Sequence, residues 1–231
     1  FLQSEMTNPL FLTLFCQNYT GTDFDMFTLF EKVIEKAEDE AQKAVGMKET
    51  ISVLNSLVDE MVGFRLTHSA LTMTQEELFE LKFWERYGLT SSKIPFVSSL
   101  VRSGFLISTA AEHTETYYLG YNLLEDFVCA KTILREHPQK EELISYVQND
   151  LLKIENGCIS NYHNIDIFIV VCGLYAEKYH EECFEDIEVN VTDEFDKNDI
   201  VRRYLESFVW RKSSSVDSET FRSFINRYPI D

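Results

Sequence analysis

The sequence predicts a mostly helical protein that carries one small β-hairpin. Apolar residues recur at helical spacing over most of the 231 residues. Within 74–134, however, helical spacing stops at Gly104. β-like runs then cover Phe105–Ile107 and Tyr117–Leu119, on either side of a polar tip, AAEHTE. Two helices, two short strands and a closing helix in this order are the outline of a winged helix. We therefore expect a mostly α fold with a small β wing.

The residues before this block predict a helical bundle. In NPLFLTLFCQNY (8–19), Pro9 is predicted to lie in the first turn of a helix. Proline is tolerated there because an N–H at that position would make no hydrogen bond within the helix. Amphipathic patterns over 25–45 and 49–66 predict two longer helices. We expect residues 1–66 to form a first, helical domain.

A second domain, 67–136, holds the winged-helix pattern. Thr74 and Glu77 have the spacing of a capping box at the start of a helix. The helix at the recognition position covers about 92–103, and the apolar pattern over 122–134 predicts the closing helix.

A third region, 137–231, is predicted to be helical. Its helices are spaced like helix pairs, although no sequence repeat defines a solenoid. The predicted helices cover 140–154, 165–179, 197–211 and 218–228. The segment 181–199 has nine acidic residues and one Lys, so we expect it to be a solvated loop or linker.

Composition limits the classes of partner. Lys and Arg number 21 and Asp and Glu number 39, which gives a formal net charge of −18. Nucleic-acid binding needs clustered cations, so this balance disfavours it. The five cysteines show no CxxC spacing, which favours a cytoplasmic location over disulfides or a zinc site. No apolar run reaches the roughly 18 residues of a membrane span, so no membrane partner is expected.

The sequence contains no recognisable catalytic or metal-ligating set. The phosphate loop GxxxxGK[ST], the zinc motif HExxH and the nucleophile turn GxSxG are all missing. Glu125 and Asp126 are adjacent carboxylates, but neighbouring positions do not share a helix face. We expect these two residues to be exposed or packed against a partner domain. No catalytic residue is predicted.

Three motifs in order resemble those of NACHT-type STAND ATPases, a family of nucleotide-gated signalling proteins. NPLFLTLFC (8–16) resembles the Pro-containing segment that follows the family's nucleotide-binding core. YYLGYNLLEDFVCAKTIL (117–134) resembles the strand-to-helix motif commonly written FxHxxFQEFFAA. YLESFVWR (204–211) resembles a helix early in the sensor region of bacterial antiviral members.

The resemblance implies two contacts to nucleotide. Pro9 matches the Pro that packs on the adenine side, and Tyr121 stands where many members have a His that touches the phosphate. A phenol donates one hydrogen bond but is not protonated near neutral pH as a His can be. The resemblance further implies ATP or ADP with Mg in a full-length parent. It places the phosphate loop and the metal-binding strand before Phe1, so this part is expected to bind no nucleotide tightly.

The same resemblance implies the function. The chain would be the helical, winged-helix and early sensor part of a bacterial STAND signalling ATPase, not itself an enzyme. It would gate nucleotide-dependent activation in antiphage defence. Its partners would be the nucleotide-binding domain on its N-terminal side, a protein trigger at the C-terminal sensor, and other copies of the parent in an oligomer.

Two other functions fit the helical pattern. A winged-helix transcription regulator would use the helix at 92–103, whose non-core positions offer Lys93, Ser98, Ser99 and Arg102 to DNA. An acidic protein-interaction scaffold would need no nucleotide. Two basic residues on an acidic protein make nucleic acid the less favoured partner.

Overall fold

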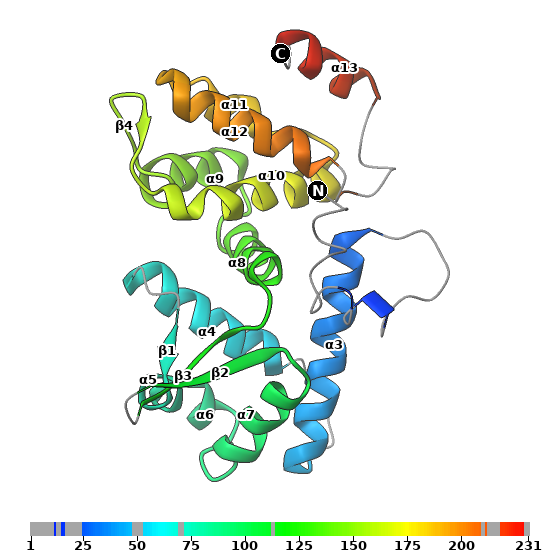
Figure 1. The fold of residues 1–231 in the computed structure, drawn as a ribbon, viewed down its shortest axis with the longest axis vertical. Helices are drawn as coiled ribbons and strands as arrows, with labels where there is room; N and C mark the ends of the chain where they lie inside the picture. The colour runs from blue at the N-terminus through cyan, green and yellow to red at the C-terminus, as the bar shows by residue number, and fades with distance from the viewer. Residues whose placement is uncertain are drawn as a thin grey trace. The chain divides into compact units, whose positions relative to one another are not determined.

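The computed structural model describes residues 12, 15–16, 25–47, 53–68, 72–111, 114–208, 211 and 218–228. These residues are mostly helical, with a small antiparallel sheet and one separate hairpin (Figure 1). The predicted mostly helical fold is therefore confirmed. Pro9 lies outside the described residues.

The chain divides into two compact units. We call 28–129, with 15–16, the sheet unit, and we call 130–228, with Leu12 and 25–27, the helical unit. Helices α3 and α8 each contain a boundary between the units.

The sheet unit contains a short strand at 73–74 that the sequence did not predict, and the helix expected from Thr74 onward is divided in two. Its elements are α3 (Met26–Val45), α4 (Val53–His68), β1 (Met73–Thr74), α5 (Gln75–Glu80), α6 (Phe83–Arg86), α7 (Lys93–Arg102), β2 (Leu106–Ala111), β3 (Thr114–Leu119) and α8 (Asn122–Glu136). The strands pair antiparallel in the order β1-β3-β2. Gly104 has a φ of +77° where α7 ends, which is the conformation that favours glycine after a helix.

The wing strands are longer than the sequence predicted. Pairing continues through Ala110↔Glu115 and Ala111↔Thr114, so most of the expected polar tip AAEHTE belongs to the strands. The hydroxyls of Thr109 and Thr116 lie 2.9 Å apart across the pair. Backbone pairing satisfies main-chain N–H and C=O groups whatever the side chains are. Polar residues can therefore continue a strand, and the apolar pattern identified only part of each strand.

Aromatic side chains fill the core of the sheet unit. The ring of Trp84 meets those of Phe83 and Phe96 edge to face, at centroid distances of 4.9 and 5.8 Å. The Trp84 indole Nε1–H donates to the carbonyl of Leu78 at 2.7 Å, so its one polar group is satisfied. Phe30 brings α3 to the same core through Phe127 of α8, at 5.4 Å.

Carboxylates from neighbouring helices cap two helix starts in this unit. Glu38 of α3, only 9% exposed, accepts from the backbone N–H groups of Val53 and Leu54 at the start of α4. Glu60 of α4 accepts from the N–H of Phe83 at 2.9 Å, where α6 begins. The first N–H groups of a helix have no acceptor within that helix. Each of these carboxylates therefore supplies the missing acceptor from a neighbouring helix. The capping box of Thr74 and Glu77 is confirmed.

The helical unit is built around one buried helix. Its elements are α9 (Lys140–Tyr146), the π-helix η1 (Val147–Leu151), β4 (Ile154–Glu155), β5 (Cys158–Ile159), the 3-10 turn η2 (Tyr162–Asn164), α10 (Ile165–Tyr179), α11 (Phe184–Glu188), α12 (Glu194–Ser207) and α13 (Ser218–Arg227). Helix α10 has the bounds that the sequence predicted, and ten of its residues are buried.

Helices α10 and α12 run parallel (Figure 1). The Asp196 carboxylate accepts from the N–H of Ile159 at 2.6 Å, and farther along Arg203 pairs with Asp166 at 2.5 Å. These two contacts advance in the same direction along both segments, in agreement with a parallel course.

The acidic segment 181–199 is not a solvated loop, and that prediction was wrong. It folds into α11 and the start of α12, with Phe184, Ile187 and Val191 fully buried. Most of its carboxylates have internal partners. The ion pairs include Glu182–Arg211, Glu185–Arg227, Asp186–Lys140, Glu188–Lys197 and Asp199–Arg203. The negative charge of this segment, which suggested a solvated loop, is largely neutralised by Lys and Arg side chains of the same unit.

The sequence analysis also missed the β4–β5 hairpin. Asn156 and Gly157 have φ values of 53° and 81°, as a two-residue type I′ turn requires. The Asn-Gly pair was the signal for it. A Cβ on Gly157 would lie 1.9 Å from Thr192 Oγ1, so the turn is closely packed as well as left-handed.

We expect Gly157→Ala to destabilise the protein by about 1–3 kcal/mol, because it combines backbone strain with a clash. Gly63→Ala is the matched control. Gly63 lies within α4, where a Cβ would meet nothing within 4 Å, so that change should stabilise by up to about 1 kcal/mol. Urea titration followed by circular dichroism measures both. Equal effects of the two substitutions would contradict the assigned turn.

We expect Glu38→Ala to destabilise by about 1–3 kcal/mol, because it leaves buried N–H groups of α4 without an acceptor. Glu35→Ala, at an exposed position of the same helix, should change stability by no more than about 0.5 kcal/mol. Hydrogen exchange at Val53 and Leu54 localises the effect. Unchanged protection of these two amides in Glu38→Ala would show that the carboxylate does not cap α4.

Candidate functional site

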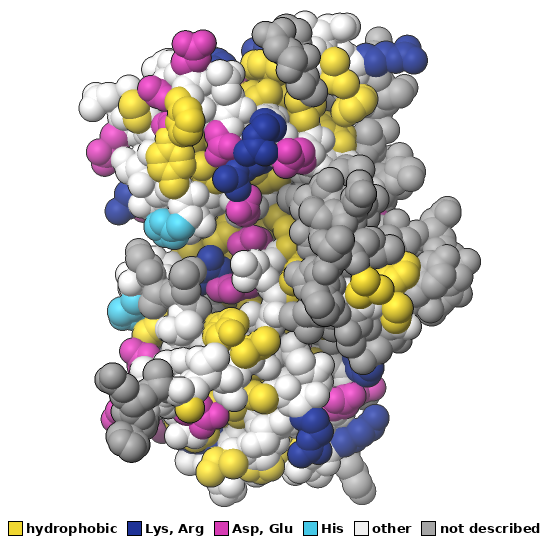
Figure 2. All heavy atoms as spheres, viewed as in Figure 1, with side chains coloured by type: hydrophobic (Ala, Val, Ile, Leu, Met, Phe, Trp, Pro, Cys, Tyr) yellow, Lys and Arg dark blue, Asp and Glu magenta, His cyan; other side chains and the backbone are white. Residues whose placement is uncertain are grey.

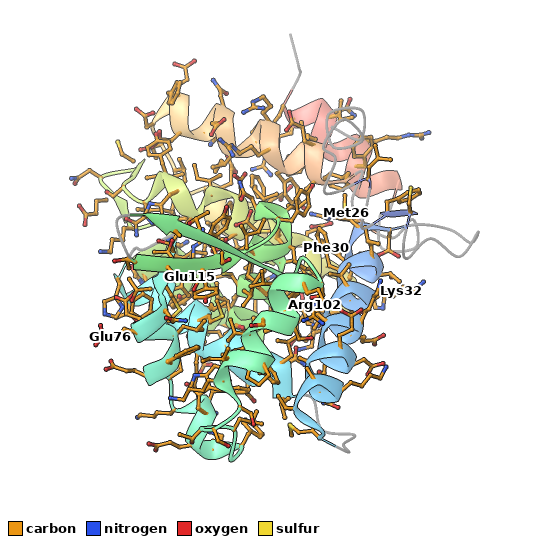
Figure 3. The ribbon with its side chains drawn as sticks, turned by 60° about the horizontal axis from the view of Figure 1, so that its bottom comes forward. Met26, Phe30, Lys32, Glu76, Arg102 and Glu115 are labelled. Atoms are coloured by element: carbon orange, nitrogen blue, oxygen red, sulfur yellow. The ribbon has the colours of Figure 1, made fainter. Side chains whose placement is uncertain are left out.

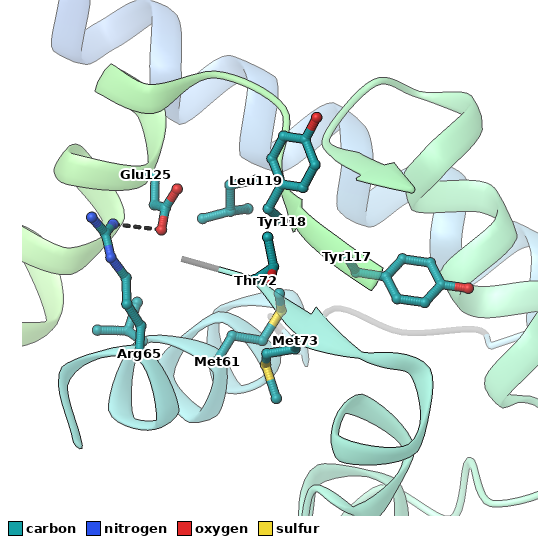
Figure 4. Close-up of a pocket in the computed structure, with 9 residues that line it drawn as sticks. Met61, Arg65, Thr72, Met73, Tyr117, Tyr118, Leu119 and Glu125 are labelled. Carbon is teal, nitrogen blue, oxygen red and sulfur yellow. Dashed lines mark hydrogen bonds and ion pairs between the residues drawn. The ribbon is translucent and has the colours of Figure 1, made fainter. Parts of the chain in front are cut away.

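A hollow of about 20 Å³ opens in the sheet unit where four elements meet (Figure 4). Helix α4 contributes Met61 and Arg65, and α8 contributes Glu125. Thr72 and Met73 border it at β1, and Tyr118 and Leu119 border it from β3. Its lining combines apolar side chains with the polar groups of Arg65, Glu125, Thr72 and Tyr118. The volume suits about one water molecule or the tip of a side chain.

An ion pair closes one end of the hollow. Arg65 Nη1 donates to Glu125 Oε1 at 2.5 Å, and each side chain is 13% exposed. The same nitrogen lies 3.8 Å from Cys129 Sγ. Figure 4 shows the guanidinium and the carboxylate facing one another. The pair connects the last turn of α4 to the first turn of α8.

Burial governs the protonation of the groups around the pair. Desolvation raises the pKa of Glu125, and the nearby Arg65 charge offsets part of this rise. Burial also raises the pKa of the Cys129 thiol to about 12, so this sulfur is not a thiolate nucleophile at neutral pH. At the far side of the hollow, burial and a hydrogen bond to Glu115 raise the pKa of Tyr117 to about 12. The site therefore offers hydrogen bonds and charge, and the described residues include no activated nucleophile there.

The expectation for Glu125 and Asp126 was wrong. Glu125 is paired within the sheet unit, and Asp126 is 8% exposed. The carboxylates occupy adjacent positions of α8, but both lie on its buried side. The sequence signal for this pairing was Arg65 in the helix predicted over 49–66. A buried Arg needs a nearby carboxylate.

Tyr121 lies at the start of α8, one turn before Glu125. Its carbonyl accepts from the Glu125 N–H at 3.0 Å, which makes it the residue that precedes the first helical turn. Its ring packs against Phe30 at 5.9 Å, and the residue is 7% exposed. Asn122 is the first residue of α8. The structure thus places Tyr121 in the core, four residues before Glu125 in the sequence.

A nucleotide does not fit this hollow. Ligand pockets for such molecules are roughly 300–1,000 Å³, far larger than the 20 Å³ hollow. Among the described residues, no group of three or more His, Cys, Asp or Glu side chains could hold a metal ion.

Helix α7 presents few cations to a polyanion. Lys93 Nζ donates to the carbonyl of Phe79 at 2.5 Å and lies over the Phe79 ring, so it is committed to the fold. Ser99 is buried, whereas Arg102 is exposed on α7 (Figure 3). On the face shown in Figure 2, the Lys and Arg side chains lie mostly beside acidic ones. These positions weaken the case for a DNA-reading helix.

Comparison with protein-family models, with curated proteins and with solved structures finds no match. Within the part of the chain that the structure describes, no helix is both long enough and apolar enough to cross a membrane.

We expect Arg65→Met to destabilise the protein more at pH 7 than at pH 4. Arg65 lowers the pKa of Glu125, so its loss raises that pKa further above the value of the unfolded chain. The added penalty is then small where Glu125 is protonated in both states and grows as the pH rises through the folded pKa. The effect at pH 7 should be about 1–3 kcal/mol.

Urea titrations at the two pH values measure this difference. Arg202→Met is the matched control, because Arg202 pairs with Asp199 and Glu206 on the surface with 58% of its side chain exposed. Its effect should stay below about 1 kcal/mol at both pH values. A pH-independent loss in Arg65→Met would show that the substitution acts through packing and not through the ion pair.

Proposed function

We propose that this chain is a gating module of a NACHT/STAND-type signalling ATPase, in which it acts without catalytic residues of its own. The observation that supports this most is the order of elements from α4 to α8. A helix, a short strand, two helical segments, a third helix and a two-stranded wing are followed directly by α8, whose first residue comes just after Tyr121. This order has the outline of a winged helix, and it is joined to a layered helical region that would begin a sensor.

The proposed mechanism is a shift between two states of the parent protein. A ligand changes such an equilibrium only by its different affinity for the two states. In the closed state, the corner at Tyr121 would face a nucleotide held by another domain of the parent, with Pro9 on the adenine side. A protein trigger at the sensor would favour the open, oligomeric state, and antiphage defence in the bacterial cytoplasm is the proposed setting.

The Arg65–Glu125 pair gives this mechanism a physical element. It connects α4 with the first turn of α8, and Glu125 hydrogen-bonds to Tyr121 through the backbone. A displacement of the Tyr121 corner would therefore act directly on the start of α8. Because the pair is half-buried, separating it would leave two charges poorly solvated, so intermediate positions would be disfavoured.

The test uses the protein encoded by the complete gene. We expect a GxxxxGK[ST] loop and an acidic-ended strand in the coding sequence before Phe1, and we expect the purified protein to bind ADP. Tyr121→Phe should weaken ADP binding about two- to tenfold, the value of one neutral hydrogen bond. Tyr118→Phe removes a hydroxyl from β3, three residues earlier, and should leave the affinity for ADP unchanged.

Isothermal titration calorimetry with ADP separates the outcomes. A complete protein with no phosphate loop and no ADP binding would exclude the proposed function. ADP binding that Tyr121→Phe leaves unchanged would instead assign Tyr121 a structural role and remove it from the site.

A further inference from the structure

We propose that Cys172 and Cys183 are a redox switch, a pair of thiols that forms a reversible disulfide within the helical unit. Cys172 lies within α10, and Cys183 is the residue just before α11. The disulfide would fix the link between these two helices, residues 180–183, to α10. The inference involves neither nucleotide nor the hollow in the sheet unit, so it goes beyond the proposed function.

The two sulfur atoms are already neighbours. Cys183 Sγ lies 3.8 Å from Cys172 Sγ, and both residues are fully buried. Both cysteines are free thiols in this structure. A disulfide holds its sulfur atoms about 2.05 Å apart, so these two would have to approach by roughly 1.8 Å. A change of that size is within the reach of a side-chain rotation combined with a small backbone shift.

The backbone before Cys183 can supply this movement. Helix α10 ends at His180, whose φ of 54° turns the chain out of the helix. The next three residues, 181–183, belong to no helix or strand. The side chain of Cys183 makes no capping hydrogen bond to α11, so its rotation would break no cap. Cys172 is held within α10, and we therefore expect Cys183 to be the partner that moves.

The surroundings of the pair favour a neutral product. Burial is the largest influence on the Cys172 thiol and raises its pKa, whereas the nearby Arg211 charge lowers it. A metal ion would need both sulfur atoms as thiolates, and burial disfavours two such charges. A disulfide carries no charge, so its formation leaves no buried charge behind. Oxidation is therefore the reaction that suits this pair.

The proposed oxidant is a low-molecular-weight disulfide such as glutathione disulfide. The Cys183 thiolate attacks one sulfur of the oxidant, which breaks the S–S bond and releases one small thiol. The Cys172 thiolate then attacks the sulfur of Cys183 in the mixed disulfide and releases the second small thiol. Each departing thiol takes up the proton that the attacking cysteine lost. Two protein thiols are oxidised, and one small disulfide is reduced to two thiols.

Arg211 supplies a buried cation for the second step. Its side chain is fully buried and pairs with Glu182 at 2.8 Å, and its Nε has no hydrogen-bond partner among the described residues. A Cβ on Gly173, the residue after Cys172, would lie 3.5 Å from this Nε. A thiolate at Cys172 would therefore form close to a positive charge and an unused donor, which stabilises it during the exchange.

Access to the pair requires the link to open. Cys183 is buried, but residues 178–181 just before it are exposed, so a local opening there would uncover its sulfur. Glu182 accepts from both Arg211 and the hydroxyl of Tyr204. A disulfide at Cys183 would hold Glu182 in place and, through it, the segment that follows α12. Where glutathione keeps thiols reduced, protein disulfides are usually transient and serve redox sensing, which matches a reversible bond.

The experiment equilibrates the chain with mixtures of reduced and oxidised glutathione, alkylates the remaining thiols and maps disulfides by mass spectrometry. We expect a Cys172–Cys183 bond to be the main internal cross-link and to be reversed by dithiothreitol. Closing this short loop should raise the thermal unfolding midpoint by about 5–10 °C. Amide hydrogen exchange over 180–183 should slow on the order of tenfold on oxidation, because the link can no longer open.

Cys183→Ala and Cys172→Ala should each form no internal cross-link and show no change of midpoint on oxidation. Cys158→Ser is the matched control, because Cys158 is exposed. It should keep both the cross-link and the shift of the midpoint. Circular dichroism of each reduced variant checks that the fold is retained.

Three results would overturn the proposal. The unaltered chain could form no Cys172–Cys183 bond at any glutathione ratio, the bond could appear only after the native circular dichroism is lost, or oxidation could leave the midpoint unchanged. None of these results depends on ADP, so failure here leaves the gating proposal to its own test.

Discussion

The sheet unit depends on carboxylates that satisfy backbone N–H groups at helix ends. Glu38 caps α4 from α3, and Glu60 caps α6 from α4. Each of these carboxylates joins two elements and, at the same time, removes the cost of burying unpaired donors. In the helical unit, Asp196 does the same for the N–H of Ile159. The arrangement gives part of the strongly acidic composition a structural explanation, since these residues are needed to fix the elements to one another. A net charge of −18 is then weak evidence about partners.

This use of acidic residues explains where sequence-based inference succeeded and where it failed. The capping box at Thr74 and the bounds of α10 were predictable, because both depend on residues close together in the chain. The acidic segment 181–199 was misjudged, because its partners, such as Lys140 and Arg211, are distant in sequence. The β4–β5 turn could have been predicted from its Asn-Gly pair. Its close contact with Thr192 could not, since that contact depends on the tertiary fold.

The site shows the same limit. Sequence resemblance directed attention to Tyr121, and the structure places that residue in the core against Phe30. The polar groups at the hollow are instead Arg65 and Glu125, which lie 60 residues apart. No periodicity or motif pairs such residues, and only their shared burial shows that each needs the other. A half-buried pair of this kind orients α8 relative to α4 more strictly than apolar packing alone, because its geometry tolerates little displacement.

The parallel course of α10 and α12 has an electrostatic consequence. Antiparallel neighbours cancel their helix dipoles, whereas parallel neighbours add them, with partial positive charge at each N-terminal end. Here both N-terminal ends carry acidic side chains: Asp166 in the first turn of α10, and Glu194 and Asp196 in that of α12. The last turn of α10 carries Lys178. These charges oppose the summed dipole at both ends of α10. The helical unit can therefore keep two aligned helices side by side without a strong axial field.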